Sequence, residues 1–172
     1  FQSISRNALG SPDVSGFSFF AHGQSGSTTL SWVEGGLFTQ TQVRNGLGMF
    51  ARKINTFIIQ LGINIASGEG ADTDESEALY KSRIETIIDQ WKASAEAVGG
   101  KDIRVLLMAP WGSAYGGFWA ARRAAALLEI AQERKSYVSF INVDRIMDLR
   151  YGPDWRDIYT DVGIHQIQAG IE

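Results

Sequence analysis

The sequence predicts an α/β fold, a three-layer α/β/α sandwich around a central, mostly parallel sheet. Strand-like and helix-like patterns alternate along the chain, which is the order that parallel strands joined by crossover helices require. Residues 55–61 and 103–109 are nearly continuous apolar runs, as expected of strands that are covered on both faces. Because 172 residues is the length of one domain, we expect residues 1–172 to form a single unit.

The first half of the chain is expected to supply two strands and a short helix. Residues 17–22 (Phe-Ser-Phe-Phe-Ala-His) are the first strand candidate, and they run into a glycine-rich turn at residues 23–26. A helix is expected over about residues 28–33. The strand at residues 55–61 ends at Gly62-Ile63-Asn64.

A long amphipathic helix is expected next. Asp72 or Thr73 can cap its start, and acidic residues in the first turn suit the helix dipole. Its apolar side chains recur every three or four positions, and Gly99-Gly100 ends it; they are Tyr80, Ile84, Ile87, Ile88, Trp91, Ala95 and Val98. The acidic residues Glu69, Asp72, Asp74, Glu75 and Glu77 fit no EF-hand loop. We expect them to be a solvated helix start.

The second half continues the alternation. Residues 103–109 are a strand closed by Pro110, residues 118 to about 135 form an alanine-rich helix, and residues 137–143 form a strand that ends at Asp144. The tail from Leu149 onward is expected to be irregular.

Composition excludes several classes of function. The net charge is −3 and no basic stripe is present, so no nucleic-acid partner is expected. With two histidines and no cysteine, we expect no thiol nucleophile, no metal and no other cofactor. The apolar runs are too short to span a bilayer, so no membrane association is expected. The compartment is not fixed, with an extracellular or secreted location slightly favoured.

In a parallel sheet, ligands bind at the carboxyl ends of the strands, and polar residues follow the predicted strands at these ends. Ser25 and Gly26 follow the first strand candidate, Asn64 follows the second, and His165 lies near the C-terminus shortly after Asp161. A serine, a histidine base, an acid and amide donors together suit acyl transfer.

Four short blocks occur in order along the chain: residues 1–5 (Phe-Gln-Ser-Ile-Ser), 24–29 (Gln-Ser-Gly-Ser-Thr-Thr), 62–65 (Gly-Ile-Asn-Ile) and 161–165 (Asp-Val-Gly-Ile-His). Together they resemble the SGNH (GDSL) hydrolase superfamily, whose fold is similar to that of flavodoxin. Phe-Gln stands where the family has Gly-Asp in the first block, and Ile65 stands where it has Asp in the third. Relative to the family, we expect the first strand and part of the last helix to be missing from residues 1–172.

The resemblance implies a role for each matching residue. Ser3 would attack the ester carbonyl, and its N–H would join the Gly26 N–H and the Asn64 amide as oxyanion donors. His165 would take the proton of the serine. Asp161 would orient the imidazole; because it lies four residues before His165 rather than three, a backbone carbonyl is the alternative.

Several of these positions have a second interpretation. Ser25, in Gly23-Gln24-Ser25, resembles the nucleophile block of carbohydrate acetylesterases in the same superfamily, so it rivals Ser3. Asn64 also suits a simple turn. Trp111 and Tyr115 follow a predicted strand among glycines, where they are either sugar-binding aromatics or part of the core.

These expectations combine into one prediction. The chain is expected to be a serine esterase that acts through an acyl-enzyme on a small-molecule or glycan ester, with an O-acetyl group on a carbohydrate as the substrate. The alternative is a carbohydrate-binding or structural module that kept the fold without the activity. The sequence does not indicate an oligomeric state.

Overall fold

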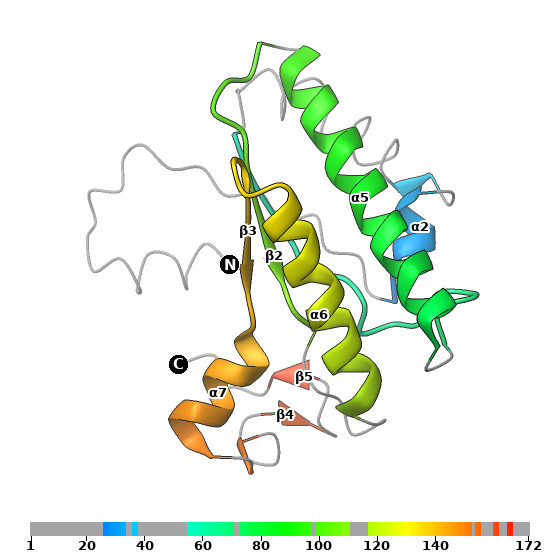
Figure 1. Cartoon of the computed structure of the whole chain (residues 1–172), viewed down its shortest axis with the longest axis vertical. Coiled ribbons are helices and arrows are strands. Elements are labelled where there is room, and N and C mark those ends of the chain that lie inside the picture. The colour runs from blue at the N-terminus through cyan, green and yellow to red at the C-terminus, as the bar shows by residue number, and fades with distance from the viewer. Residues whose placement is uncertain are drawn as a thin grey trace.

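Three parallel strands in the order β1-β2-β3 form the sheet of this protein (Figure 1). The computed structural model describes residues 26–33, 36–37, 55–70, 73–97, 99–110, 117–152, 154–155, 160–161 and 165–166. The strands are β1 (Thr56–Ile59), β2 (Arg104–Met108) and β3 (Val138–Ile141), and both pairings are parallel. The α/β class and three of the predicted strands are therefore confirmed, while the predicted strand at residues 17–22 lies outside the described residues.

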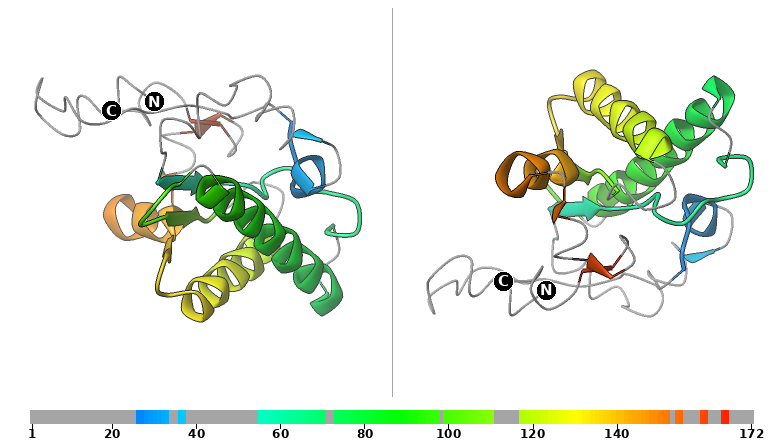
Figure 2. Two further views of the ribbon diagram at one scale, coloured as in Figure 1. Left: turned by 90° about the horizontal axis from the view of Figure 1, so that it is seen from above. Right: turned by 90° about the horizontal axis from the view of Figure 1, so that it is seen from below.

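Two long helices cover one face of this sheet. Helix α5 (Asp74–Ala97) connects β1 to β2, helix α6 (Gly117–Glu133) connects β2 to β3, and the two pack against each other (Figures 1 and 2). Both were predicted within a few residues of their observed bounds. The short helix α2 (Thr29–Val33) packs against α5 and confirms the helix predicted over residues 28–33.

The main core lies between the sheet and these helices. The register aligns Phe57 with Val105 and Val138, and all three side chains are buried. The ring of Phe57 is 4.8 Å from that of Trp91 on α5, centroid to centroid. Six of the seven apolar residues predicted as the stripe of α5 are buried, and they are Tyr80, Ile84, Ile87, Ile88, Trp91 and Ala95. Val98 lies outside the described residues.

The other face of the sheet carries a second set of apolar side chains. The burial of β1 alternates, so Ile58 points away from the core and is 44% exposed. Its partner on β2, Leu106, and Met108 two residues further along the same strand are half-buried. Among the described residues, helices α5 and α6 both lie on the opposite, core-facing side (Figure 2).

A helix that was not predicted follows β3 directly. Strand β3 stops at Ile141, and α7 (Val143–Tyr151) occupies the place of the expected strand end and the start of the expected irregular tail. The reason is local: the Asn142 side chain accepts a 3.0 Å hydrogen bond from the N–H of Arg145 and caps the helix. After α7, β4 (Thr160–Asp161) and β5 (His165–Gln166) form an antiparallel pair.

Candidate functional site

The turn after β1 brings together two of the sequence blocks that were singled out. The side-chain amide of Asn64 donates a 3.2 Å hydrogen bond to the backbone carbonyl of Ser27, 37 residues earlier in the chain. Gly26 precedes Ser27 and has φ +73°, and Gly62 has φ +116°. The positive φ of Gly62 would strain any other residue, and a Cβ atom there would lie 3.1 Å from both Arg123 and Tyr80, so those side chains would also have to shift.

The segment that carries Ser27 is fixed by the start of α2. The N–H of Ser31 donates to Oγ1 of Thr28, and the N–H of Thr28 donates to Oγ of Ser31, both at 3.2 Å. This reciprocal pair follows the pattern of a capping box, with serine in the place of the usual Glu or Gln. The carbonyl that accepts from Asn64 therefore belongs to an ordered helix start.

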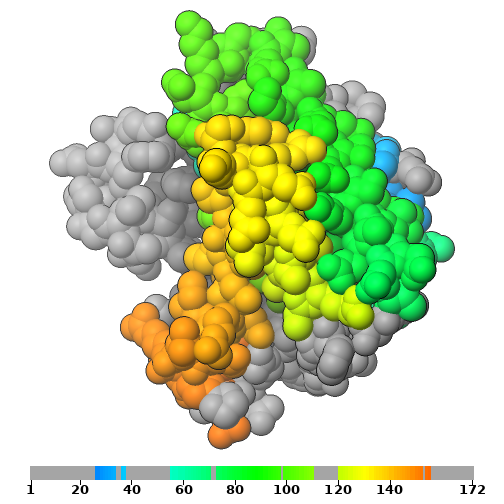
Figure 3. Space-filling view, in the orientation of Figure 1, coloured from blue at the N-terminus to red at the C-terminus, as the bar shows by residue number. Residues whose placement is uncertain are grey.

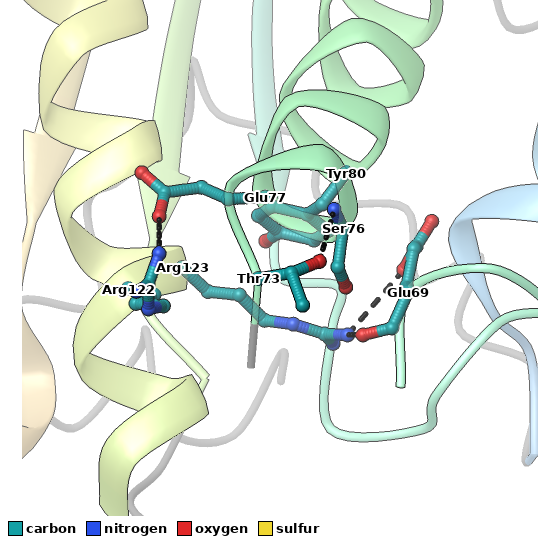
Figure 4. Close-up of a pocket in the computed structure, with 7 residues that line it drawn as sticks. All are labelled: Glu69, Thr73, Ser76, Glu77, Tyr80, Arg122 and Arg123. Carbon is teal, nitrogen blue, oxygen red and sulfur yellow. Dashed lines mark hydrogen bonds and ion pairs between the residues drawn. The ribbon is translucent and has the colours of Figure 1, made fainter. Parts of the chain in front are cut away.

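Beneath the turn lies a buried carboxylate. The side chain of Glu69 is fully buried, and its Oε1 atom accepts hydrogen bonds from Thr29 Oγ1 and, at 2.7 Å, from Arg83 Nη1. Its Oε2 atom lies 3.5 Å from Nη2 of Arg123 (Figure 4). The expectation that residues 69–77 form a solvated helix start is wrong for Glu69, because the loop folds inward and two guanidinium groups neutralise the charge.

Arg123 joins the carboxylate to the end of β1. Its Nη1 donates to the carbonyl of Gly62, and its Nη2 donates to the carbonyl of Glu69 at 3.2 Å. The guanidinium carbon lies 4.7 Å from the centre of the Tyr80 ring, and the Tyr80 hydroxyl donates to the carbonyl of Leu61 at 2.8 Å. Burial lowers the pKa of Arg123 and raises the pKa of Tyr80 above its ordinary value.

A small cavity adjoins this group of side chains. It has a volume of about 10 Å³, which is room for about one water molecule. Its lining comes from the loop after β1 and from α5 and α6 (Figure 4), and consists of Glu69, Thr73, Ser76, Glu77, Tyr80, Arg122 and Arg123. Arg122 is held by Asp74 and Glu77 at 2.8 and 3.1 Å. The cavity is too small for an ester substrate, so it is not a catalytic pocket.

The predicted acid and base lie in the short β4–β5 pair. Asp161 is the direct backbone partner of His165 in the antiparallel register. The pair lies beyond the carboxyl ends of β2 and β3, on the side of the sheet away from α5 and α6 (Figures 1 and 2). Of the other predicted residues, Ser3 and its rival Ser25 lie outside the described residues, as do Trp111 and Tyr115.

Sequence reasoning missed the role of Glu69 and Arg123. Arg122-Arg123 reads as one of several scattered basic pairs, and Glu69 reads as one of several loop acids. The only available signal was the position of Glu69 between two glycines in a turn that follows a buried strand. Nothing in the spacing relates it to an arginine 54 residues later.

Comparisons with protein-family models, with curated proteins and with solved structures found no match. Within the described ranges, no group of three or more histidine and acidic side chains is arranged to hold a metal ion. None of the helices in those ranges has the length and apolarity needed to cross a membrane.

Proposed function

We propose that this chain is an SGNH-type serine esterase that cleaves an O-acetyl ester on a carbohydrate through an acyl-enzyme. The hydrogen bond from Asn64 to Ser27 is the observation that carries the proposal. It puts the Gly26 turn beside the Asn64 side chain, and these are two of the three donors that the resemblance assigns to an oxyanion hole. If Asn64 only formed a turn, its side-chain amide would not need to bond to the block at residues 24–29.

The remaining hydrogen of the Asn64 amide is the chemically useful one. A side-chain amide has two N–H groups, and the bond to Ser27 uses one of them and fixes the plane of the group. The second, with the N–H of Gly26, would stabilise the oxyanion of a tetrahedral intermediate. A preorganised donor of this kind contributes about 10²–10³ in kcat.

The proton transfers are assigned to His165. It would take the proton of the serine hydroxyl as the oxygen attacks the ester carbonyl, and would give it to the leaving alcohol when the intermediate collapses. Water would then release the acyl group by the same route. The backbone pairing of Asp161 with His165 supports the acid assignment, because it puts the two residues directly opposite each other in the antiparallel pair.

The nucleophile has two candidates. The resemblance of the first block assigns Ser3, and the resemblance of Gly23-Gln24-Ser25 to the acetylesterase block makes Ser25 its rival. Both serines lie outside the described residues, and the experiment below is designed to distinguish the two.

We also propose the three-layer arrangement for the whole fold. The second face of the sheet carries Ile58, Leu106 and Met108, and an apolar face of a parallel sheet needs cover. Helices on that face would complete the sandwich and would leave the carboxyl ends of the strands open for substrate. Trp111 and Tyr115 remain the predicted aromatic contacts to a sugar.

One observation favours the alternative of a binding or structural module without activity. Ile65, which is 50% exposed, stands where the family has an aspartate. The module and the enzyme make different predictions for a covalent serine probe, because only an activated serine hydroxyl reacts with it.

The test is reaction of the longest natural form of the protein with a fluorophosphonate, followed by mass spectrometry of the labelled peptide. We expect one labelled serine, and we expect His165→Ala to abolish both the labelling and the turnover of p-nitrophenyl acetate. Ser25→Ala and Ser3→Ala identify the nucleophile, with Ser139→Ala on an exposed strand position as the control. Absence of both labelling and turnover in the folded parent would leave only the module.

A further inference from the structure

Five side chains, four of them buried and Arg83 partly buried, form a network that ties four segments of the chain together. The network consists of Thr29, Glu69, Tyr80, Arg83 and Arg123, and these come from α2, the loop after β1, α5 and α6. Their contacts converge on the two segments that carry the proposed oxyanion donors.

One side of the network holds the end of β1. Tyr80 donates to the carbonyl of Leu61, and Arg123 donates to the carbonyl of Gly62. These are the third and second residues before Asn64, so the backbone that leads into the donor is bound at two successive carbonyls. Arg83 holds the far side of the same loop through the carbonyl of Ser67, at 2.9 Å.

The other side of the network reaches the Ser27 segment. The hydroxyl of Thr29 donates to the carboxylate of Glu69, and Thr29 is two residues after Ser27. Glu69 therefore links the segment that accepts from Asn64 to the loop that carries Asn64. A fully buried carboxylate is costly unless each partner is in place, so the network strongly favours one relative position of the two segments.

We infer that Glu69 and Arg123 are positioning residues that hold the Asn64 amide against the Ser27 carbonyl and so set the position of the Asn64 donor in the proposed oxyanion hole. This inference rests on the proposed esterase function. It assigns a catalytic consequence to a buried charge pair that takes no part in the proposed chemical steps. The exposed ion pair of Lys81 with Glu129 and Glu133 also joins α5 to α6, but it does not reach the loop after β1.

The test uses Glu69→Gln and Arg123→Lys in the full chain, each alone and combined with Asn64→Ala. Arg123→Lys keeps the charge but loses the paired N–H groups of the guanidinium. We expect kcat on p-nitrophenyl acetate to fall about 10²-fold in the single variants, the size of loss that a misplacement of about 1 Å can cause, with little change in KM. In the Asn64→Ala background the same substitutions should have almost no further effect on kcat, because the donor they position is absent.

Lys81→Met is the matched control, since it removes an ion pair between the same two helices and should leave kcat unchanged. Equal losses of kcat with and without Asn64 would overturn the inference, because the network would then act on the fold in general. So would parent-like kcat in folded Glu69→Gln and Arg123→Lys. Should both variants fail to fold, Thr29→Val, which removes one hydroxyl from the network, is judged by the same criteria.

A second measurement separates this inference from the esterase proposal. The side-chain amide signals of Asn64 in a ¹H–¹⁵N NMR spectrum, assigned by their absence in Asn64→Ala, report its hydrogen bond whether or not the protein is active. We expect Glu69→Gln to move these signals toward the values of an unconstrained amide, and Lys81→Met to leave them unchanged. A parent that hydrolyses no ester refutes the esterase, whereas unmoved Asn64 signals in folded Glu69→Gln refute the positioning role.

Discussion

At the scale of single residues, Tyr80 shows how burial and one hydrogen bond determine a protonation state. Its hydroxyl is inside the protein and donates to the carbonyl of Leu61. Burial raises its pKa above the ordinary value of 10.0, with the charge of Glu69 as a smaller contribution in the same direction, opposed by Arg123. The folded protein therefore keeps this phenol protonated at a pH where the unfolded chain ionises.

This shift predicts a loss of stability at high pH. Above pH 10.0 the unfolded state binds fewer protons than the folded state, so the free energy of unfolding falls as the pH rises, by up to about 1.4 kcal/mol per pH unit for this one group. Below pH 10.0 the phenol is protonated in both the folded and the unfolded state, so this group adds no pH dependence to the free energy of unfolding. Tyr80→Phe should be less stable than the parent at pH 8 and should lose less stability between pH 10 and 11. Urea unfolding at each pH measures both effects, and parallel pH profiles for the two proteins would contradict the prediction.

The residues of the site were only partly predictable from sequence. Gly62 and Asn64 directly follow a buried strand. Such positions are predicted to be part of a site, because ligands bind at the carboxyl ends of parallel strands. Glu69 and Arg123 could not be predicted, because their pairing depends on how α6 docks on the sheet. That docking brings together residues far apart in sequence, and no local pattern encodes it.

At the scale of secondary-structure elements, the long helices were predictable and the short one was not. The apolar stripe of α5 runs from Tyr80 to Ala95 and repeats over about four turns, so its period is unambiguous. Helix α7 has nine residues and no fully buried side chain, so no stripe distinguishes it from a continued strand. What determines its start is a cap, and a single Asn gives little signal in a sequence.

The cap of α7 gives a prediction for this element. Asn142→Ala should lower the free energy of unfolding by about 1 kcal/mol, since it removes the acceptor for the N–H of Arg145. Asn142→Asp should be close to the parent, because aspartate accepts the same bond and suits the positive end of the dipole. Chemical denaturation followed by circular dichroism measures the difference. A neutral Asn142→Ala would mean that the cap does not determine where the helix begins.

At the scale of the whole molecule, one core joins all three strands to α5 and α6, with Trp32 and Trp91 among its residues (Figure 3 shows α5 and α6 packed together on the surface above it). The α/β class followed from the alternation of patterns along the chain. The sandwich remains a prediction, because a sequence pattern shows that the second face of a sheet is apolar without showing what covers it.

The shared core predicts unfolding in one step. Tryptophan fluorescence and far-UV circular dichroism should give the same urea transition. Ile87→Ala, at a position that is 1% exposed, should lower stability by about 2–5 kcal/mol by both probes. Ile146→Ala, at a position that is 47% exposed, is the control and should stay within about 0.5 kcal/mol of the parent. Separate transitions for the two probes would show that the strands and helices do not share one cooperative unit.

The bond between Arg123 and the carbonyl of Gly62 also has a consequence for biosynthesis. The two residues are 61 positions apart, and a ribosome adds about 5–20 residues per second, so Gly62 is made about 3–12 s before its partner. During that interval the turn after β1 lacks the guanidinium that completes it. A nascent chain that stops between β2 and α6 cannot form this arrangement, so the turn after β1 is completed only once α6 has been made.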